Sequence, residues 1–256
     1  MAMSDLLFPI FLIPWRIQTL YKDSWLIGGP LGQVLCKLVS FLPKVSSTVS
    51  IQSLVLIAVD RFGAVVFPLR LPLISSKLCP FLILATWIVA MAIFSPQLFV
   101  NKVVEYPEKL VCQLHWSEVF GESSSYEHYM ISYIVLFGFV PLVLIAILYI
   151  TIYLKLKSKK IPGEQSTNAG QQRQQRERNV LKMAIAIVLG FAVCLLPITI
   201  FWCILLFTDT IIWPNCGDPY FEYVARLIAT ANCAINPCIC LIFSRNYRNG
   251  LKALFR

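Results

Sequence analysis

The stretch Tyr129–Leu154, with the sequence YMISYIVLFGFVPLVLIAILYITIYL, contains no Asp, Glu, Lys or Arg. A helix needs about 20 predominantly apolar residues to cross the hydrocarbon core of a bilayer, and this stretch is longer than that. Its apolar residues run continuously and do not alternate with polar ones. That pattern favours a helix, because a segment in lipid must satisfy its own backbone hydrogen bonds. The sequence therefore predicts a membrane-spanning helix here.

Further stretches extend this prediction to a bundle. Leu78–Val100, Met183–Thr208 and Leu227–Ser244 are also uncharged. Val45–Val59 is uncharged as well, and lysine and arginine side chains at its ends can reach the interface, which extends it to a full span. A further apolar run opens the chain. We therefore predict an all-α membrane protein with spans at residues 1–21, 33–66, 78–100, 128–156, 178–208 and 219–243.

The composition excludes several other classes of protein. The 256-residue chain is 58% hydrophobic and only 14% charged, whereas about a quarter of the residues of a soluble domain are charged. Its net charge of +9 therefore does not indicate a nucleic-acid binder. An enzyme is not expected, because both histidines fall outside the apolar runs and no HExxH, GxSxG or P-loop pattern occurs. A transporter or channel is disfavoured, because the third span is nearly free of polar residues.

Basic residues gather on one side of the predicted bundle. Most of the 22 lysines and arginines flank the connections after the second and fourth spans or follow the last span. They are Arg61, Arg70, Lys77, Lys155, Lys157, Lys159, Lys160, Arg173, Arg176, Arg178, Lys182, Arg245, Arg248, Lys252 and Arg256. By the positive-inside rule this side, with the C-terminus, faces the cytosol. The positive balance then reflects topology and attraction to anionic lipid.

Three further segments, the start of the chain, residues 244–255 and the connection 158–178, carry expectations of their own. Asp5 lies inside the first span with almost nothing before it, so we expect upstream sequence, including an entire earlier span, to be missing. Residues 244–255 place apolar side chains at helical spacing beside basic ones, which predicts an amphipathic surface helix; a solvated tail is the alternative. The polar connection 158–178 contains Pro162-Gly163 and many glutamines, which predicts a flexible cytosolic segment.

Short motifs follow one another along the whole chain. They are Ala2-Met3-Ser4-Asp5, Trp25-Leu26-Ile27-Gly28, Asp60-Arg61-Phe62, Trp87, Pro141 with Tyr149, Phe191-Ala-Val-Cys194-Leu-Leu-Pro197 and Asn232-Cys-Ala-Ile-Asn236-Pro237. In this order and spacing they resemble the motifs of rhodopsin-like (class A) G protein-coupled receptors, and peptide receptors in particular. The resemblance implies that the six spans correspond to helices two to seven of a seven-helix receptor bundle, without the first helix.

A disulfide bond is expected between Cys36 and Cys112. Both fall on the predicted non-cytosolic side, where oxidation is allowed. Cys36 opens the second span and Cys112 lies in the connection 101–127, so the bond would tie that connection across the helix ends. A second disulfide bond, between Cys203 and Cys216, is the less favoured alternative to free thiols at these positions.

Arg61 is the predicted centre of a switch. An arginine at a helix end is desolvated unless it is paired, and Asp60 and Glu177 are candidate partners on the same membrane face. Breaking these pairs would free Arg61 to face a heterotrimeric G protein. An arginine that reaches toward lipid phosphates is the alternative. The resemblance adds Tyr149 to this coupling site.

Helix kinks are the second element of the predicted switch. Pro141, Pro197 and Pro237 each interrupt an uncharged span, and proline kinks a helix by removing a backbone hydrogen bond. Static curvature is the alternative for each. The resemblance adds Phe191, Cys194, Leu195 and Asn236 to this group. The sequence departs from the family at three positions, where Phe62, Leu195 and Cys240 replace the usual tyrosine, tryptophan and tyrosine.

The resemblance implies two further sites inside the bundle. Asp5, Ser50, Asn232 and Asn236 would converge as oxygen ligands of an allosteric sodium ion, and no other cofactor is expected. A hydrogen-bonded polar cluster without an ion is the alternative. The ligand pocket is assigned to Lys44, Ser47, Leu195, Phe201 and Trp202.

The ligand is expected to be a peptide. Pro43 stands where amine receptors of the family carry an aspartate, which disfavours an amine. The connection 101–127 is acidic and aromatic, which suits a basic neuropeptide. A lipid or another small molecule is the alternative ligand, and a truncated receptor that does not signal is the alternative function.

Overall fold

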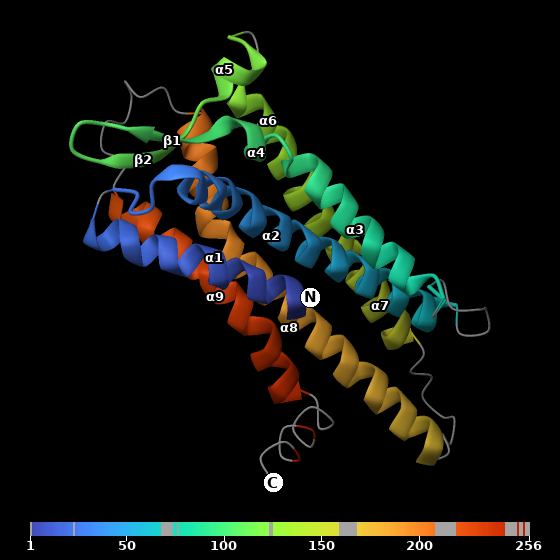
Figure 1. The fold of residues 1–256 in the computed structure, drawn as a ribbon. Helices are drawn as coiled ribbons and strands as arrows, with labels where there is room; N and C mark the ends of the chain where they lie inside the picture. Colours follow the sequence, from blue (N-terminus) through green and yellow to red (C-terminus); the bar gives the residue numbers. More distant parts are fainter. Residues whose placement is uncertain are drawn as a thin grey trace. The chain divides into compact units, whose positions relative to one another are not determined.

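The computed structural model describes residues 2–22, 24–67, 74–75, 77–122, 125–158, 168–207 and 219–243, together with 250 and 253 (Figure 1). Its elements are α1 (Ala2–Tyr21), α2 (Gly29–Val66), α3 (Cys79–Phe94), α4 (Gln97–Val100), β1 (Asn101–Glu105), β2 (Leu110–Leu114), α5 (Trp116–Phe120), α6 (Tyr126–Tyr133), the π-helix η1 (Ile134–Phe139), α7 (Val140–Ser158), α8 (Asn168–Phe207) and α9 (Pro219–Phe243). The chain divides into unit 1, Met1–Ser53 with Lys77–Gly138, and unit 2, Leu54–Ser76 with Phe139–Arg256.

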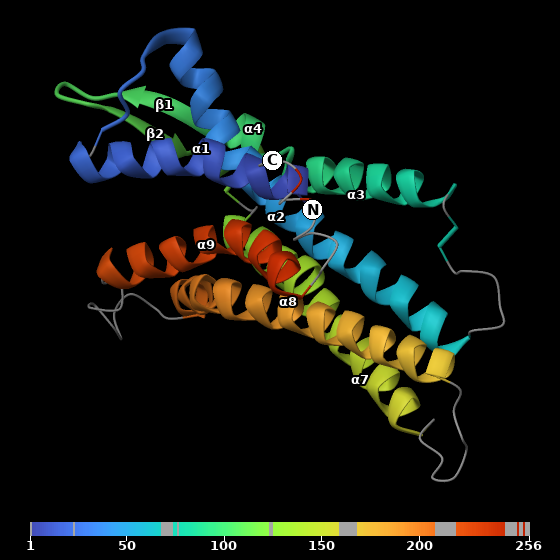
Figure 2. The same cartoon turned by 90° about the horizontal axis from the view of Figure 1, so that it is seen from below.

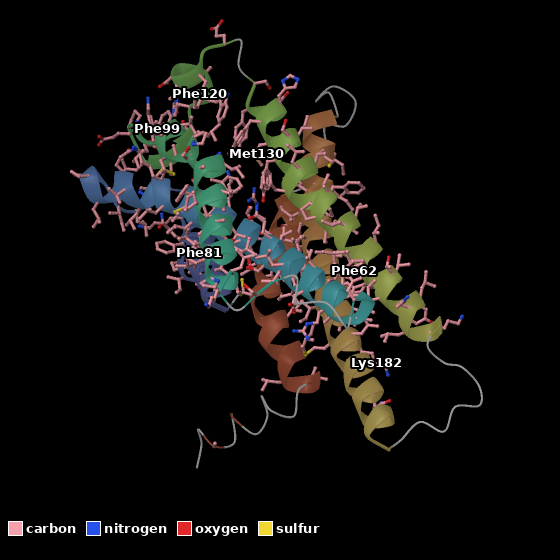
Figure 3. All side chains as sticks on the ribbon, turned by 90° about the vertical axis from the view of Figure 1, so that its right-hand side faces the viewer. Phe62, Phe81, Phe99, Phe120, Met130 and Lys182 are labelled. Atoms are coloured by element: carbon pink, nitrogen blue, oxygen red, sulfur yellow. A yellow bond between two sulfur atoms is a disulfide. The ribbon has the colours of Figure 1, made fainter. Side chains whose placement is uncertain are left out.

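Four helical stretches among the described residues are long and apolar enough to cross a membrane. They are Gly29–Val66, Cys79–Val100, Tyr126–Lys157 and Leu181–Phe201, and α9 holds the shorter apolar stretch Tyr223–Ile235. Exposed apolar side chains such as Phe81 on α3 (Figure 3) suit a surface that faces lipid. The prediction of long apolar helices is thereby confirmed for four stretches of the described chain. The count of six spans and the missing first helix stay predictions.

The core of unit 1 lies between α2 and α3. Phe41, Val45 and Val49 are spaced by four residues, so they form one stripe along α2, and all three are buried. Ala90 and Phe94 of α3 are fully buried in the same cluster. This packing holds the start of α2 and the end of α3 together, and the connection that follows α3 is thereby anchored.

In unit 2, α8 and α9 pack along their length. Both Figure 1 and Figure 2 show the two helices side by side. Buried residues recur at helical spacing on both helices, among them Ala184, Ile187, Phe191 and Cys194 on α8 and Ala225, Ala229 and Asn232 on α9. Gly190 marks a close approach, because a Cβ atom added there would lie 2.7 Å from Ile235 Cγ2.

We expect Gly190→Val to destabilise unit 2 by about 1–3 kcal/mol, because overpacking forces the two helices or the Ile235 side chain to shift. The measurement is the thermal unfolding of the purified protein in detergent. Ile235→Ala should rescue the variant in part by making room for the added methyl groups. An unchanged transition in Gly190→Val would contradict the tight approach at this position.

The spans predicted at 33–66 and 78–100 differ from the observed helices at one end each. The helix predicted at 33–66 begins earlier, at Gly29, because Pro30 fits the first turn of a helix, where its missing N–H is not needed. The helix predicted at 78–100 ends at Phe94, and a second short helix, α4, begins at Gln97. Pro96 explains the break, because proline cannot continue the backbone ladder. The Ser95 hydroxyl instead donates to Ala92 O at 2.8 Å.

The span predicted at 128–156 runs from Tyr126 to Ser158 and contains a π-helical segment. The segment Ile134–Phe139 ends two residues before Pro141. The wider π turn accommodates the backbone carbonyl that proline leaves without its usual partner. Pro197 lies inside α8, and Thr199 Oγ1 donates to Leu195 O at 2.8 Å nearby. Pro237 lies in α9, and its side chain is outside the described residues.

The prediction of a flexible segment at 158–178 is wrong for its second half. The helix α8 begins at Asn168, ten residues before the predicted start of that span. Glutamine, arginine, glutamate and alanine all have good helix propensity, so this polar stretch extends the apolar helix that follows. The span predicted at 219–243 has the bounds of α9. The predicted amphipathic helix 244–255 and Cys216 lie outside the described residues, except for 250 and 253.

The connection 101–127 folds in a way that the sequence analysis did not predict. Its first part is an antiparallel hairpin of β1 and β2, in which Asn101 pairs with Leu114 and Glu105 with Leu110. The turn closes where Tyr106 N–H donates to Lys109 O at 2.9 Å. Pro107 suits the second position of such a turn. The short helix α5 and then α6 follow the hairpin (Figure 1).

Candidate functional site

The hairpin is covalently attached to α2. Cys36 and Cys112 form a disulfide bond with their Cα atoms 5.7 Å apart, and Cys36 is fully buried. The predicted bond is thereby confirmed. It closes a separation of 76 residues, so the start of α2 and the middle of β2 form one structure.

Two further contacts join the hairpin to the residues that begin α2. The backbone N–H of Trp25 donates to Leu110 O at 2.6 Å, which adds one bridge to the free edge of β2. The side chain of Gln33 contacts the edge of β1 through Asn101 and Val103. These contacts place the hairpin beside α2 within unit 1.

Asn101 forms the turn from α4 into β1. Its side-chain amide donates to Gln97 O at 2.7 Å and lies 3.2 Å from Gln97 Oε1. The first bond satisfies a carbonyl that the end of a helix leaves open. Both residues are buried, so the start of the hairpin is fixed by local hydrogen bonds as well as by the disulfide.

An ion pair links the hairpin to α5. Lys102 Nζ of β1 lies 2.7 Å from Glu118 Oε2, and His115 Nδ1 lies 2.8 Å from Glu118 Oε1. The hydrogen bond from Lys102, and then that from His115, hold the pKa of Glu118 below its ordinary value of 4.5. The Glu118 carboxylate is exposed to solvent, so these contacts add little to the stability of the fold. Their main effect is to orient α5 relative to β1.

We expect this link to be lost in acid. Because the folded-state pKa is lowered, the contribution of Glu118 is present above about pH 4.5 and is lost as the pH falls through the lowered pKa. Glu118→Gln should therefore reduce amide protection in β1 and α5 at pH 6, and the difference from the parent should shrink as the pH falls below about 4.5. Hydrogen exchange measures the amide protection of the parent and of the variant at each pH. Glu108→Gln, an exposed change at the hairpin turn, is the control, and an equal effect there would contradict a specific pair.

Aromatic side chains pack between α5 and α6. The ring of Trp116 lies 4.6 Å from Phe120, 5.3 Å from Tyr126 and 5.0 Å from Tyr129, measured between centroids. Tyr129 Oη donates to Ile93 O at 2.8 Å, which connects this group to α3. The aromatic residues of the connection therefore form a packed group in unit 1, and Figure 3 labels Phe120 on it.

Lys44 of α2 contacts the same aromatic group. Its Nζ lies 3.5 Å from Tyr126 Oη and 6.0 Å from the centre of that ring. A cation near the face of an aromatic ring is attracted by the ring quadrupole. One turn further, Thr48 Oγ1 lies 3.2 Å from Tyr133 Oη. The side of α2 that carries Lys44 is thus lined by tyrosines from α6.

The predicted ligand-pocket residues divide between the two units. Lys44 and Ser47 belong to unit 1 and are half-buried. Leu195 and Phe201 belong to unit 2, where the Phe201 ring lies 6.1 Å from Phe221. The side chain of Trp202 is outside the described residues. Their grouping into one pocket stays a prediction.

The predicted coupling residues lie near the end of α2. Arg61 Nη2 and Asp60 Oδ2 form an ion pair at 2.9 Å, with 48% of the arginine side chain and 33% of the aspartate side chain exposed. Tyr149 of α7 is buried. The side chain of Glu177 is outside the described residues, so a second pair with Arg61 stays a prediction.

The predicted sodium ligands and kink residues are described in part. Asn232 is buried, and among the described residues its Oδ1 has no hydrogen-bond partner. Ser50 is buried in unit 1. The side chains of Asp5 and Asn236 are outside the described residues. Phe191 and Cys194 are buried on the face of α8 that packs on α9.

Sequence comparison extends these observations. Residues 1–239 match the family described as 7 transmembrane receptor (rhodopsin family). The RYamide receptor of Drosophila melanogaster is 28% identical over 99% of this chain and 54% of its own length. A QRFP-like peptide receptor of Branchiostoma floridae is 30% identical over 100% of this chain and 67% of its own length. The substance-P receptor of Homo sapiens is 29% identical over 88% of this chain and 54% of its own length.

Four helical stretches among the described residues have the length and composition of membrane spans, and a disulfide attaches a hairpin to one of these helices. The match over residues 1–239 shows that the chain belongs to the rhodopsin family of seven-transmembrane receptors. The three relatives are receptors for peptides by name, not enzymes. The chain spans about half to two thirds of their length.

Proposed function

We propose that this chain binds an extracellular peptide and, through rearrangement of its helices at the cytosolic face, activates a heterotrimeric G protein. The family match supports this activity, and the names of the relatives support a peptide as the ligand. The observation that carries the proposal is the placement of two sites on one helix. Near its start α2 carries the disulfide to the hairpin, and near its end it carries the pair of Asp60 and Arg61.

The hairpin and the aromatic group are the proposed peptide-facing surface. Glu105, Glu108, Glu118 and Glu122 are exposed in this connection, so a basic peptide would meet complementary charge there. Exposed apolar side chains of the same region include Phe99 and Phe120, which Figure 3 labels on α4 and α5. Lys44 with Tyr126 would contact the part of the ligand that reaches between the helices.

The test is nucleotide exchange on purified G proteins by membranes that contain the chain. The probes are RYamide peptide, a QRFP-like peptide and substance P, each with a scrambled peptide as its control. We expect at least one probe to stimulate exchange above membranes that lack the chain. Binding without exchange would favour the alternative of a receptor that does not signal. No binding of any peptide, with binding of a lipid or other small molecule, would overturn the peptide assignment.

An allosteric sodium ion is part of the proposal. Asn232 Oδ1 is a buried carbonyl oxygen of the kind that hard cations prefer, and it has no partner among the described residues. Ser50, Asn236 and Asp5 would supply the other oxygens. Sodium should lower the affinity of an activating peptide in the parent chain, and Asn232→Ala should weaken that dependence. An equal sodium effect in both would argue for a polar cluster without an ion.

A further inference from the structure

The edge of β1 that faces away from β2 is bonded to a side chain. The N–H of His115 donates to Val100 O at 2.7 Å, so Val100 and His115 form a hydrogen-bonded pair at the base of the hairpin. Hydrogen-bonded and non-hydrogen-bonded residue pairs alternate along antiparallel strands. The backbone N–H and C=O groups of Asn101 and Val103 therefore point away from β2. Such edge groups are open to pairing unless another element covers them.

Gln33 of α2 covers this part of the edge. Its Nε2 donates to Asn101 O at 3.1 Å, and its Oε1 accepts from Val103 N–H at 2.9 Å. One primary amide thus presents a donor and an acceptor to β1 as the backbone of a neighbouring strand would. Val103 is also the residue that pairs with Cys112 across the hairpin. The amide contact and the disulfide therefore act on directly opposite residues of the two strands.

The disulfide alone leaves a degree of freedom. A chain attached through a single pair of cysteine side chains can still rotate about the bonds of those side chains. Gln33 lies one helical turn before Cys36, so the two side chains project from the same region of α2. Two hydrogen bonds at a second point oppose that rotation. The amide is uncharged, so this contact does not depend on salt or pH as the pair of Lys102 and Glu118 does.

We propose that Gln33 is a positioning residue. Its side-chain amide bonds to the edge of β1 as the backbone of a neighbouring strand would, and it thereby fixes the orientation of the hairpin on α2. The consequence for ligand binding rests on the proposed function: a fixed hairpin holds the peptide-facing surface ready, which slows peptide dissociation. The peptide then meets a hairpin whose Val103 N–H is already bonded, so it contacts the hairpin here through side chains.

Hydrogen exchange of the full chain in lipid nanodiscs tests the contact without any ligand. We expect Gln33→Met, which keeps a similar length and removes both hydrogen bonds, to lower the protection of the Val103 amide on the order of tenfold. Gln113→Met is the matched control, because Gln113 lies on the same hairpin and its side chain accepts from Tyr106 Oη, away from Gln33. Equal Val103 protection in the parent and in Gln33→Met would overturn the proposal.

Gln33→Glu separates hydrogen bonding from packing. A neutral carboxylic acid has one donor and one acceptor, as the amide contact requires, whereas a carboxylate has acceptors only and faces Asn101 O unfavourably. Protection of Val103 should therefore return as the pH falls through about 4.3, the ordinary pKa of a glutamate. Gln33→Met should show no such recovery. A pH profile of Gln33→Glu that is as flat as that of Gln33→Met would show that only packing matters and would overturn the proposal.

The consequence for ligand binding is measured with whichever labelled probe, RYamide peptide or substance P, activates the parent chain. Gln33→Met should raise its dissociation rate on the order of three- to tenfold, with the unfolding temperature unchanged. An unchanged rate, with reduced Val103 protection, would overturn the role in ligand binding. A parent chain that binds neither probe would contradict the proposed peptide ligand instead, and the exchange measurements would still decide the role of Gln33.

Discussion

Replacing Cys36 with serine is expected to remove most of the receptor that can be delivered to the cell surface. The bond closes a separation of 76 residues, and chain entropy for a loop of this size corresponds to about 4–5 kcal/mol of stability. That amount is a large fraction of the whole stability of an ordinary domain. Trp25 contributes one hydrogen bond to the hairpin and Gln33 contributes two, each worth only about 1 kcal/mol, so together they do not replace the covalent bond.

The measurement is surface labelling together with the unfolding temperature of the purified chain. Cys112→Ser should match Cys36→Ser, and the double variant should be no worse than either, because each change already removes the same bond. Cys79→Ser is the control, since Cys79 is an exposed free thiol on α3. Surface levels and stability in Cys36→Ser equal to those of the parent would contradict the structural role of the bond.

The helices and this disulfide could be predicted because their signals are local and strong. An uncharged stretch as long as Tyr129–Leu154 has few alternatives to a helix. The exact limits of the helices depend on single residues within and beside these stretches. Pro96 ends α3 inside a stretch that is uncharged throughout, and the helix propensity of the glutamines before Arg178 extends α8 to Asn168.

The hairpin left a weaker signal in the sequence. Its strands have five residues each, and the sequence between them offers Pro107 as the turn residue. A proline between two short runs rich in valine and leucine is a recognisable turn pattern, and it could have been used. The contact of Gln33 with Asn101 and Val103 could not have been predicted, because it depends on the register of β1 and on the place of the hairpin beside α2.

Arg61→Ala is expected to abolish G protein activation while peptide binding and surface delivery stay near the parent level. Arg61 pairs with its neighbour Asp60, and 48% of the arginine side chain and 33% of the aspartate side chain are exposed. An exposed pair of this kind contributes only about 0–1 kcal/mol to stability, so removing it should not unfold the chain. A loss of signalling in this variant would therefore report on the contact with the G protein and not on folding.

Lys182→Ala is the matched control for this experiment. Lys182 is an exposed basic residue of α8 in the same unit, labelled in Figure 3, and its removal changes the net charge by the same amount. Nucleotide exchange should persist in Lys182→Ala and be absent in Arg61→Ala at equal receptor density. Equal exchange in Arg61→Ala and in the parent would refute the role of Arg61 and would favour an arginine that only reaches toward lipid phosphates.

The two candidate partners of Arg61 can be separated by their effects on basal output. If a pair with Glu177 ties α8 to the end of α2 in the resting state, Glu177→Ala should raise exchange in the absence of peptide, because an ion pair that opposes helix separation is lost. Asp60 is adjacent to Arg61 on the same helix, so the pair between them places no tie between helices. Asp60→Asn should then free the arginine but leave the helices together. It should therefore raise basal exchange less than Glu177→Ala does. Basal exchange that rises in Asp60→Asn and stays unchanged in Glu177→Ala would show that Asp60 alone holds Arg61 in the resting receptor.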